Sequence, residues 1–381
     1  MGNLDPFRAA GNPLFNDNKL KLGIFGSNCS NACAMTLAET SFEPTWEKNV
    51  EIAHMLEAGG FECMVPIARW RGIGGATNFN GNCMETYTWA AALAAVTEKI
   101  YLFATSHVPV VHPIVAAKMA TTIDRISKGR LGINMVCGWF APEMEMFGAK
   151  MMEHDTRYDY ASEWVEIVLK AWTEQWFDYK GEFLTINQGF ADPKPYQKPR
   201  PVLISAGSSP KGREFAAKYC DINFSVVENI EKGTAWVKHM KELAWSKSRR
   251  EIGTFTYSYA VVRDTEKEAR EYYNYYVNEK GDWEAADAVC KIYGMESGSY
   301  SREYFDQFRA AFIAGWGGYP LIGTPEQVTD QLLKLSGTGI DGTLVSMVDY
   351  NQELPYWNER MMPLLEQAGL RKPRAQARIA A

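Results

Sequence analysis

Short apolar runs alternate with amphipathic segments along most of the chain. Eight runs have the length and the enrichment in Ile, Val, Leu and Phe that predict buried strands. They span residues 20–25, 61–65, 100–105, 131–136, 202–206, 221–226, 255–262 and 342–347. Several of the segments between them repeat apolar side chains at helical spacing. In a helix predicted over 157–172, for example, Trp164, Val168 and Trp172 fall on one face.

Eight strands that alternate with helices favour an α/β fold of the (β/α)8 TIM-barrel type over an open doubly wound sheet. The glycine-rich stretch 72–75 is no dinucleotide fingerprint, because it lacks the G-x-G-x-x-G spacing and does not run into a helix. We expect one domain over residues 1–381, with terminal arms at 1–17 and 371–381. Residues 265–318 exceed ordinary loop length, so we expect an insertion between the seventh and eighth strands that acts as a lid.

The strand predicted over 131–136 leads into a long connection that opens with Phe140 and ends at Arg157. Parallel α/β folds place their chemistry where such strands end. Asn134 interrupts the apolar run of this strand. A buried amide needs hydrogen-bond partners, so Asn134 is either a satisfied core residue or a ligand contact, and burial preference alone favours the core.

Composition excludes several classes of function. The 381 residues are 46% hydrophobic and carry a net charge of −6 without a basic stripe, which argues against nucleic-acid or anionic-membrane partners. We see no signal-peptide pattern and no apolar run long enough to span a bilayer, and we expect a cytoplasmic protein. Cys29 and Cys33 have no second pair, which favours reduced thiols over zinc. No metal is expected, because His, Cys and carboxylates lack ligand spacing.

Two local patterns suit an anion. Ser208 and Ser209 precede a predicted helix, whose free N–H groups and dipole face negative charge. The alternative is a simple helix N-cap. Arg157 lies at a predicted helix start, where its charge opposes the dipole unless an anion is present. Its alternative is a surface charge.

Other side chains allow both a chemical and a structural interpretation. His107 and His112 follow the third strand, where either could be a general acid or a substrate contact. A hydrogen-bonded loop histidine is the alternative, which we favour for His112. Trp70 and Trp139 would either wall an aromatic substrate pocket or belong to the core. Cys137 is expected to be a buried, inert thiol.

Taken in order, several motifs resemble the flavin-dependent monooxygenases of the bacterial luciferase superfamily. They are Gly129-Arg130, Asn134, Gly138-Trp139, Glu143, His154–Tyr158 and Ala206–Ser209. The resemblance covers most of residues 19–265 and resumes over 320–366. The resemblance is strong for the pyrimidine oxygenase branch, and nearly as strong for the dimethylsulfone and alkanesulfonate monooxygenases. The loop Arg71–Gly75 favours the pyrimidine branch.

The resemblance implies a barrel that receives reduced FMN from a separate NAD(P)H:flavin reductase. It would use O2 as co-substrate to oxygenate a small organic molecule, such as a nitrogen heterocycle, and would form a homodimer or homotetramer. By the same resemblance, Thr105 and Asn134 lie at the oxygen-reactive face of the flavin, although Thr105 could equally be an ordinary strand residue. The implied flavin contacts are Ala68, Arg69, Asn134, Glu143, Arg157, Tyr158, Ser208 and Ser209.

Three other functions remain open at this point. The same family includes sulfone and sulfonate monooxygenases, and the same fold serves deazaflavin-dependent hydride transfer. Some relatives of luciferase bind flavin without catalysis. The presence of both Thr105 and Asn134 argues against that last function.

Overall fold

Eight parallel strands close into a barrel, which confirms the predicted fold. The computed structural model describes residues 2–295 and 302–373. Strand β11 pairs with β1 and completes the cylinder. In barrel order the strands are β1 (Lys21–Phe25), β2 (Cys63–Val65), β3 (Tyr101–His107), β4 (Leu131–Val136), β7 (Val202–Ser205), β8 (Ile222–Phe224), β9 (Gly253–Val262) and β11 (Gly342–Ser346).

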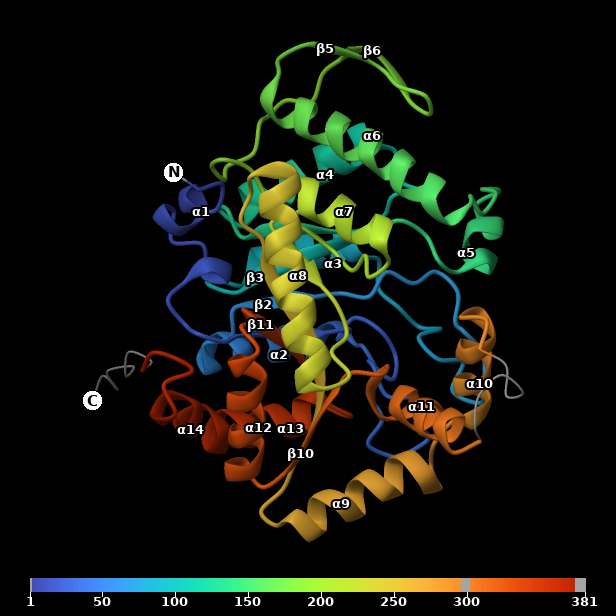
Figure 1. Cartoon of the computed structure of the whole chain (residues 1–381), viewed down its shortest axis with the longest axis vertical. Coiled ribbons are helices and arrows are strands. Elements are labelled where there is room, and N and C mark those ends of the chain that lie inside the picture. The colour runs from blue at the N-terminus through green and yellow to red at the C-terminus, as the bar shows by residue number, and fades with distance from the viewer. Residues whose placement is uncertain (1, 296–301, 374–381) are drawn as a thin grey trace.

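Helices surround this barrel (Figure 1). Local signals set their ends: Thr45 caps the start of α2, and Gly60 ends it with φ +76°. Thr324 and Gln327 form a capping box at the start of α12. Of the outer helices, α8 was not predicted from the sequence. The main outer helices are α2 (Trp46–Gly59), α3 (Thr86–Val96), α4 (Pro113–Ile126), α6 (His154–Thr173), α7 (Pro210–Tyr219), α8 (Ile230–Ser248), α12 (Pro325–Gly337), α13 (Tyr350–Tyr356) and α14 (Met362–Gln367).

The barrel interior alternates glycines with large rings. A Cβ on Gly132 would lie 2.4 Å from the ring of Phe103, and one on Gly342 would lie 2.7 Å from the ring of Phe255. Both glycines therefore make room for an aromatic side chain of a neighbouring strand. The same interior core also contains Leu4, Phe7 and Leu14. They come from α1 (Asp5–Ala9), its N-cap and the adjoining turn Pro13–Phe15, a segment that we expected to be a terminal arm.

One strand was not predicted. β10 (Tyr319–Gly323) pairs with residues 258–262 of β9, beyond residues 253–255, which pair with β8. β10 pairs with β9 alone, so its proline is tolerated at a sheet edge.

The described residues of the 265–318 insertion are mostly helical, where the sequence indicated an irregular segment with some helix. They contain α9 (Glu266–Asn274), a π-helical turn Tyr275–Glu279, α10 (Trp283–Ile292) and α11 (Arg302–Gly315). Figure 1 shows these helices grouped at the lower right. They share a small apolar core with Met35 of the loop after β1. Part of the expected lid, 296–301, lies outside the described residues.

Four further expectations need correction. The connection after β4 contains a short helix, α5 (Ala141–Met146), and α6 begins at His154 rather than at Arg157. Cys29 and Cys83 form a disulfide, where we expected reduced thiols throughout. His107 ends β3 instead of following it. Arg371, which we assigned to a loose tail, is buried against Glu62 at 2.9 Å.

A hairpin formed by β5 (Phe177–Lys180) and β6 (Thr185–Gly189) projects from the barrel beside α6 (Figure 1). Within the described part of the chain, no helix is both long and apolar enough to cross a bilayer.

Candidate active site

A cavity of about 950 Å³ opens at the C-terminal ends of the barrel strands. It collects residues from strands β3 and β4, from the loops after β2, β4, β7 and β8, and from the 265–318 insertion. Nine of the residues that sequence analysis selected line it together: Ala68, Arg69, Thr105, Asn134, Trp139, Arg157, Tyr158, Ser208 and Ser209. Three others, Trp70, His107 and Glu143, do not line it.

Thr105 and Asn134 meet at the inner end of this cavity. They are direct neighbours in the β3–β4 register, and Asn134 Nδ2 donates to Thr105 Oγ1 at 3.1 Å. Thr105 Oγ1 donates to the carbonyl of Pro66 at 2.6 Å. Asn134 Oδ1 is buried, and none of the described residues donates a hydrogen bond to it. Such an acceptor requires an explanation, and its place on the cavity wall supports the ligand interpretation over the core one.

The opposite end of the cavity suits an anion. Ser209 caps α7, and its hydroxyl oxygen accepts from the backbone nitrogen of Gly212 at 3.1 Å. Gly207 approaches Gly212 so closely that a Cβ on Gly207 would lie 2.8 Å from Gly212 Cα. Tyr158 packs against the same turn, since a Cβ on Gly212 would lie 2.6 Å from its hydroxyl oxygen. The first turn of α7 therefore borders the cavity, where the positive end of the helix dipole favours an anion.

Two arginines supply positive charge at this end. Arg157, in the first turn of α6, donates through Nη1 to the carbonyl of Gly138, while its Nε meets no acceptor among the residues that the structure describes. Arg213 of α7 also lines the cavity with an unpartnered, buried Nε. Sequence analysis missed Arg213, although its position four residues after Ser209 on a predicted helix could have drawn attention to it.

Glu143 supports the cavity wall from behind. Its side chain is 1% exposed, and Oε1 accepts from the backbone nitrogens of Trp70 at 2.8 Å and Arg71 at 3.3 Å. The same oxygen lies 3.4 Å from Arg69 Nη1. α5 thus fixes the loop after β2 through one buried carboxylate.

His107 completes this buried group. Its Nε2 lies 3.7 Å from Glu143 Oε2, and its Nδ1 has no hydrogen-bond partner in the described part of the chain. Burial lowers the pKa of His107 to about 4, because desolvation and the charge of Arg69 outweigh the attraction of Glu143. The imidazole is therefore neutral at pH 7. Its exposed neighbour His112 caps α4 by accepting from the backbone nitrogen of Ile114, as favoured above.

Aromatic side chains form the wall between the barrel and the insertion. Trp139 stacks on Tyr293 with an interplanar angle of 4° and meets Trp316 edge-on. Tyr293 and Trp316 come from the insertion, and sequence analysis singled out neither. Arg69 lies over Trp139 with its guanidinium carbon 4.9 Å from the ring centroid. Trp70 points elsewhere: it is 47% exposed and packs on Phe147.

Cys137 lines the cavity as a thiol whose pKa burial raises to about 12, which agrees with the expected inert role. No three His, Cys, Asp or Glu side chains gather as metal ligands within the described ranges.

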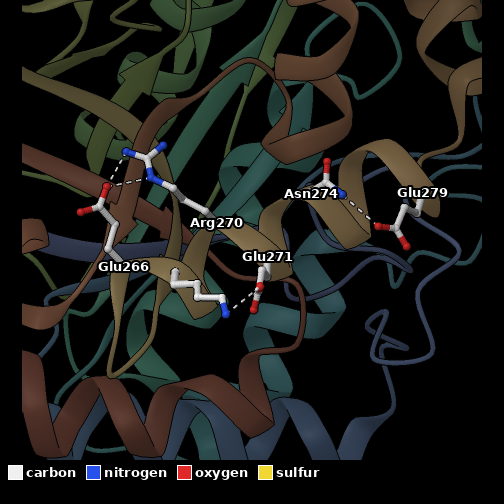
Figure 2. Close-up of a pocket in the computed structure, with 6 residues that line it drawn as sticks. Glu266, Arg270, Glu271, Asn274 and Glu279 are labelled. Atoms are coloured by element: carbon white, nitrogen blue, oxygen red, sulfur yellow. Dashed lines mark hydrogen bonds and ion pairs between the residues drawn. The ribbon is translucent and has the colours of Figure 1, made fainter.

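A second hollow, along α9, has a different character. Figure 2 shows charged side chains pairing with one another along the helix, as in Arg270 with Glu266. Lys267 pairs with Glu271 in the same way. Pairs four residues apart on an exposed helix are typical of a solvated surface. We therefore assign the chemistry to the barrel cavity.

The sequence pattern of the luciferase-like monooxygenases matches residues 22–342, which run from β1 to the first residue of β11. The chain belongs to the luciferase-like monooxygenase family. It is therefore a flavin-dependent oxidoreductase, in agreement with the resemblance noted from its motifs.

Similar proteins agree with this assignment. The chain is 31% identical to the pyrimidine monooxygenase RutA of Acinetobacter baylyi over 360 residues, covering 91% of this chain and 95% of that protein. It is 30% identical to RutA of Klebsiella pneumoniae, covering 91% and 96%.

Solved structures share the fold. Long-chain alkane monooxygenase LadA superimposes with a TM-score of 0.84 at 22% identity, covering 95% of this chain and 94% of LadA. DmoA from Hyphomicrobium sulfonivorans gives 0.81 at 20% identity, covering 94% and 90%.

Proposed function

We propose that this chain is the oxygenating component of a two-component monooxygenase. It would take reduced FMN from a separate NAD(P)H:flavin reductase and use O2 to oxygenate a small nitrogen heterocycle. The observation that carries the proposal is a single cavity with an anion-binding end and, at its other end, a buried amide and hydroxyl pair. The similarity to pyrimidine monooxygenases supports the substrate class.

The residues present fit FMN. A phosphate would meet Arg157, Ser208, Ser209 and Tyr158, together with Arg213, whose unpartnered Nε has no anion in the described protein to neutralise it. The unpartnered Asn134 Oδ1 would accept from the ring edge, and Ala68 and Arg69 would contact the ring from the loop after β2. When bound, reduced FMN supplies the electrons that activate O2.

The protein's own part is binding, orientation and exclusion of water. Thr105 fixes the amide of Asn134, because its hydroxyl oxygen accepts one Nδ2 hydrogen. Glu143 holds the loop that carries Arg69, and neutral His107 lies behind Glu143, so we propose supporting roles for both rather than direct contact with flavin or substrate. Tyr293 and Trp316 narrow the opening and limit access of water to the reacting groups.

Reconstitution tests the proposal. Purified protein is mixed with FMN, NADH and a flavin reductase under ¹⁸O2, with uracil as the first substrate. The masses of the products are measured by mass spectrometry. We expect a product that gains one ¹⁸O atom. Turnover by reduced deazaflavin without O2 would instead identify a hydride-transfer enzyme. An ¹⁸O-labelled product from dimethyl sulfone or methanesulfonate, with none from uracil, would move the chain to the sulfone and sulfonate branch.

A further inference from the structure

Asn80 presents a fixed hydrogen-bond acceptor at the cavity wall. It follows the glycine-rich loop after β2, lines the cavity and is 1% exposed. Its Nδ2 donates to the carbonyl oxygens of Ser30 and Ala32, both at 2.9 Å. Because both partners are carbonyls, the amide nitrogen must face them, and the amide cannot be flipped. Oδ1 remains, and no described residue donates to it.

The surroundings of Asn80 suit a planar ring. The preceding residue, Phe79, stacks on Trp316 with ring centroids 5.5 Å apart. Trp316 in turn meets Trp139, and Trp139 lies under the guanidinium of Arg69. An acceptor and a cationic donor therefore belong to one continuous aromatic wall. Arg69 Nη1 pairs with Glu143, but Arg69 Nε is buried and no described residue accepts its hydrogen, so this wall also offers an unused donor.

We propose that Asn80 is a specificity-determining residue that accepts a hydrogen bond from the substrate. The substrate is then a planar ring that carries an N–H or O–H donor, as a cyclic amide or a phenol does. This inference rests on the function proposed above and narrows it. Sulfones, sulfonates and alkanes lack such a donor and would leave the Asn80 oxygen desolvated and unpaired. A site built to hydrogen-bond its substrate discriminates strongly against analogues without the donor.

Matched ligands test the proposal without requiring turnover. FMN-loaded protein is titrated with uracil, thymine and 1,3-dimethyluracil, and separately with phenol and methoxybenzene, and binding is followed by the flavin absorbance spectrum. We expect removal of the donor to weaken binding at least tenfold in one or both series. Thymine adds a methyl group but keeps its N–H groups, so it should bind like uracil and so control for size.

Three results would overturn the proposal. The first is equal affinity for donor and methylated rings in both series. The second is binding of dimethyl sulfone as tightly as that of the best donor ring. The third is the failure of every ring to perturb the spectrum at millimolar concentration. Failure of the function proposed above is measured separately, as absence of FMN binding or of ¹⁸O incorporation.

A variant assigns the effect to the residue. Asn80→Ala should reduce the affinity ratio between donor and methylated rings to within about twofold, with FMN affinity unchanged because Asn80 is not among the proposed flavin contacts. Asn82→Ala, at an exposed position in the same loop, should keep the wild-type ratio. If circular dichroism shows that Asn80→Ala does not fold, the ligand series on the wild-type protein still tests the proposal. An unchanged ratio in folded Asn80→Ala would remove this residue from substrate selection.

Discussion

Asn134 Nδ2 donates a hydrogen bond across 3.1 Å to Thr105 Oγ1, which donates in turn to the carbonyl oxygen of Pro66 across 2.6 Å. The only hydroxyl proton of Thr105 is therefore already committed. What Thr105 can offer the cavity is the orientation of Asn134, whose Oδ1 and second Nδ2 hydrogen stay available. The chain of bonds joins the loop after β2 to β3 and β4, so three elements determine how one amide is presented.

Replacing Thr105 by alanine should uncouple oxygenation from flavin binding. The variant frees the Asn134 amide to rotate, so we expect product formed per FMNH2 consumed to fall at least tenfold. FMN affinity should stay within about twofold, because the phosphate end is untouched. Thr105→Ser keeps the hydroxyl and should retain most of the wild-type ratio. A wild-type ratio in Thr105→Ala would leave Thr105 as an ordinary strand residue.

Arg157→Ala should weaken FMN binding by roughly ten- to a hundredfold, because a charge-assisted contact contributes about 1.5–3 kcal/mol. Titration by flavin fluorescence measures this. Riboflavin, which lacks the phosphate, should bind wild type and variant equally. Arg270→Ala removes an arginine from the solvated face of α9 and serves as the control for net charge. Unchanged FMN affinity in Arg157→Ala would remove Arg157 from the site.

Barrel strands were predictable because burial on both faces leaves continuous apolar runs in the sequence. β4 spans residues 131–136, which is the apolar run that predicted it, and its partner β3 spans 101–107 where 100–105 was predicted. β10 was not predicted because its sequence, Tyr-Pro-Leu-Ile-Gly, is short and contains a proline, which is typical of a loop between two elements. Its pairing with β9 depends on where β8 ends, which no local pattern records.

Within the site, residues in recognisable motifs were found and isolated polar residues were not. Ser209 and Arg157 belong to motifs whose spacing has a physical reason. Asn80 lies in a polar loop, and only the carbonyl partners of its Nδ2 reveal that its oxygen faces the cavity. Glu143 is the converse: its motif was recognised, but only the folded structure turns its carboxylate toward Trp70 and Arg71.

The insertion should respond to ligand. Tyr293 and Trp316 line the cavity from residues 265–318, so filling the cavity should restrict the segments that carry them. We expect hydrogen exchange in peptides from α10 and α11 to slow when FMN is added, and to slow further with a bound substrate ring. Peptides from α8, on the outside of the barrel, provide the internal control. Equal protection with and without FMN and substrate would exclude a lid.

His107 should make stability depend on pH. Its pKa in the folded chain is about 4, below the value of 6.5 for an exposed histidine, because burial disfavours the imidazolium. Above pH 6.5 both states hold it neutral and it contributes no pH dependence. Between pH 6.5 and 4 only the unfolded state takes up the proton, so the free energy of unfolding falls by as much as roughly 3 kcal/mol.

A neutral replacement isolates this contribution from that of the carboxylates. Glu143 and Arg69, the charged groups that face His107, remain in His107→Gln, so the difference between wild type and variant reports the imidazole alone. Denaturant unfolding at pH 7, 6, 5 and 4 should show wild type losing stability relative to His107→Gln as pH falls. The exposed His239→Gln should follow wild type. Parallel curves for wild type and His107→Gln would mean that His107 becomes protonated in the folded chain, in which case Glu143 and His107 form a charged pair behind Arg69.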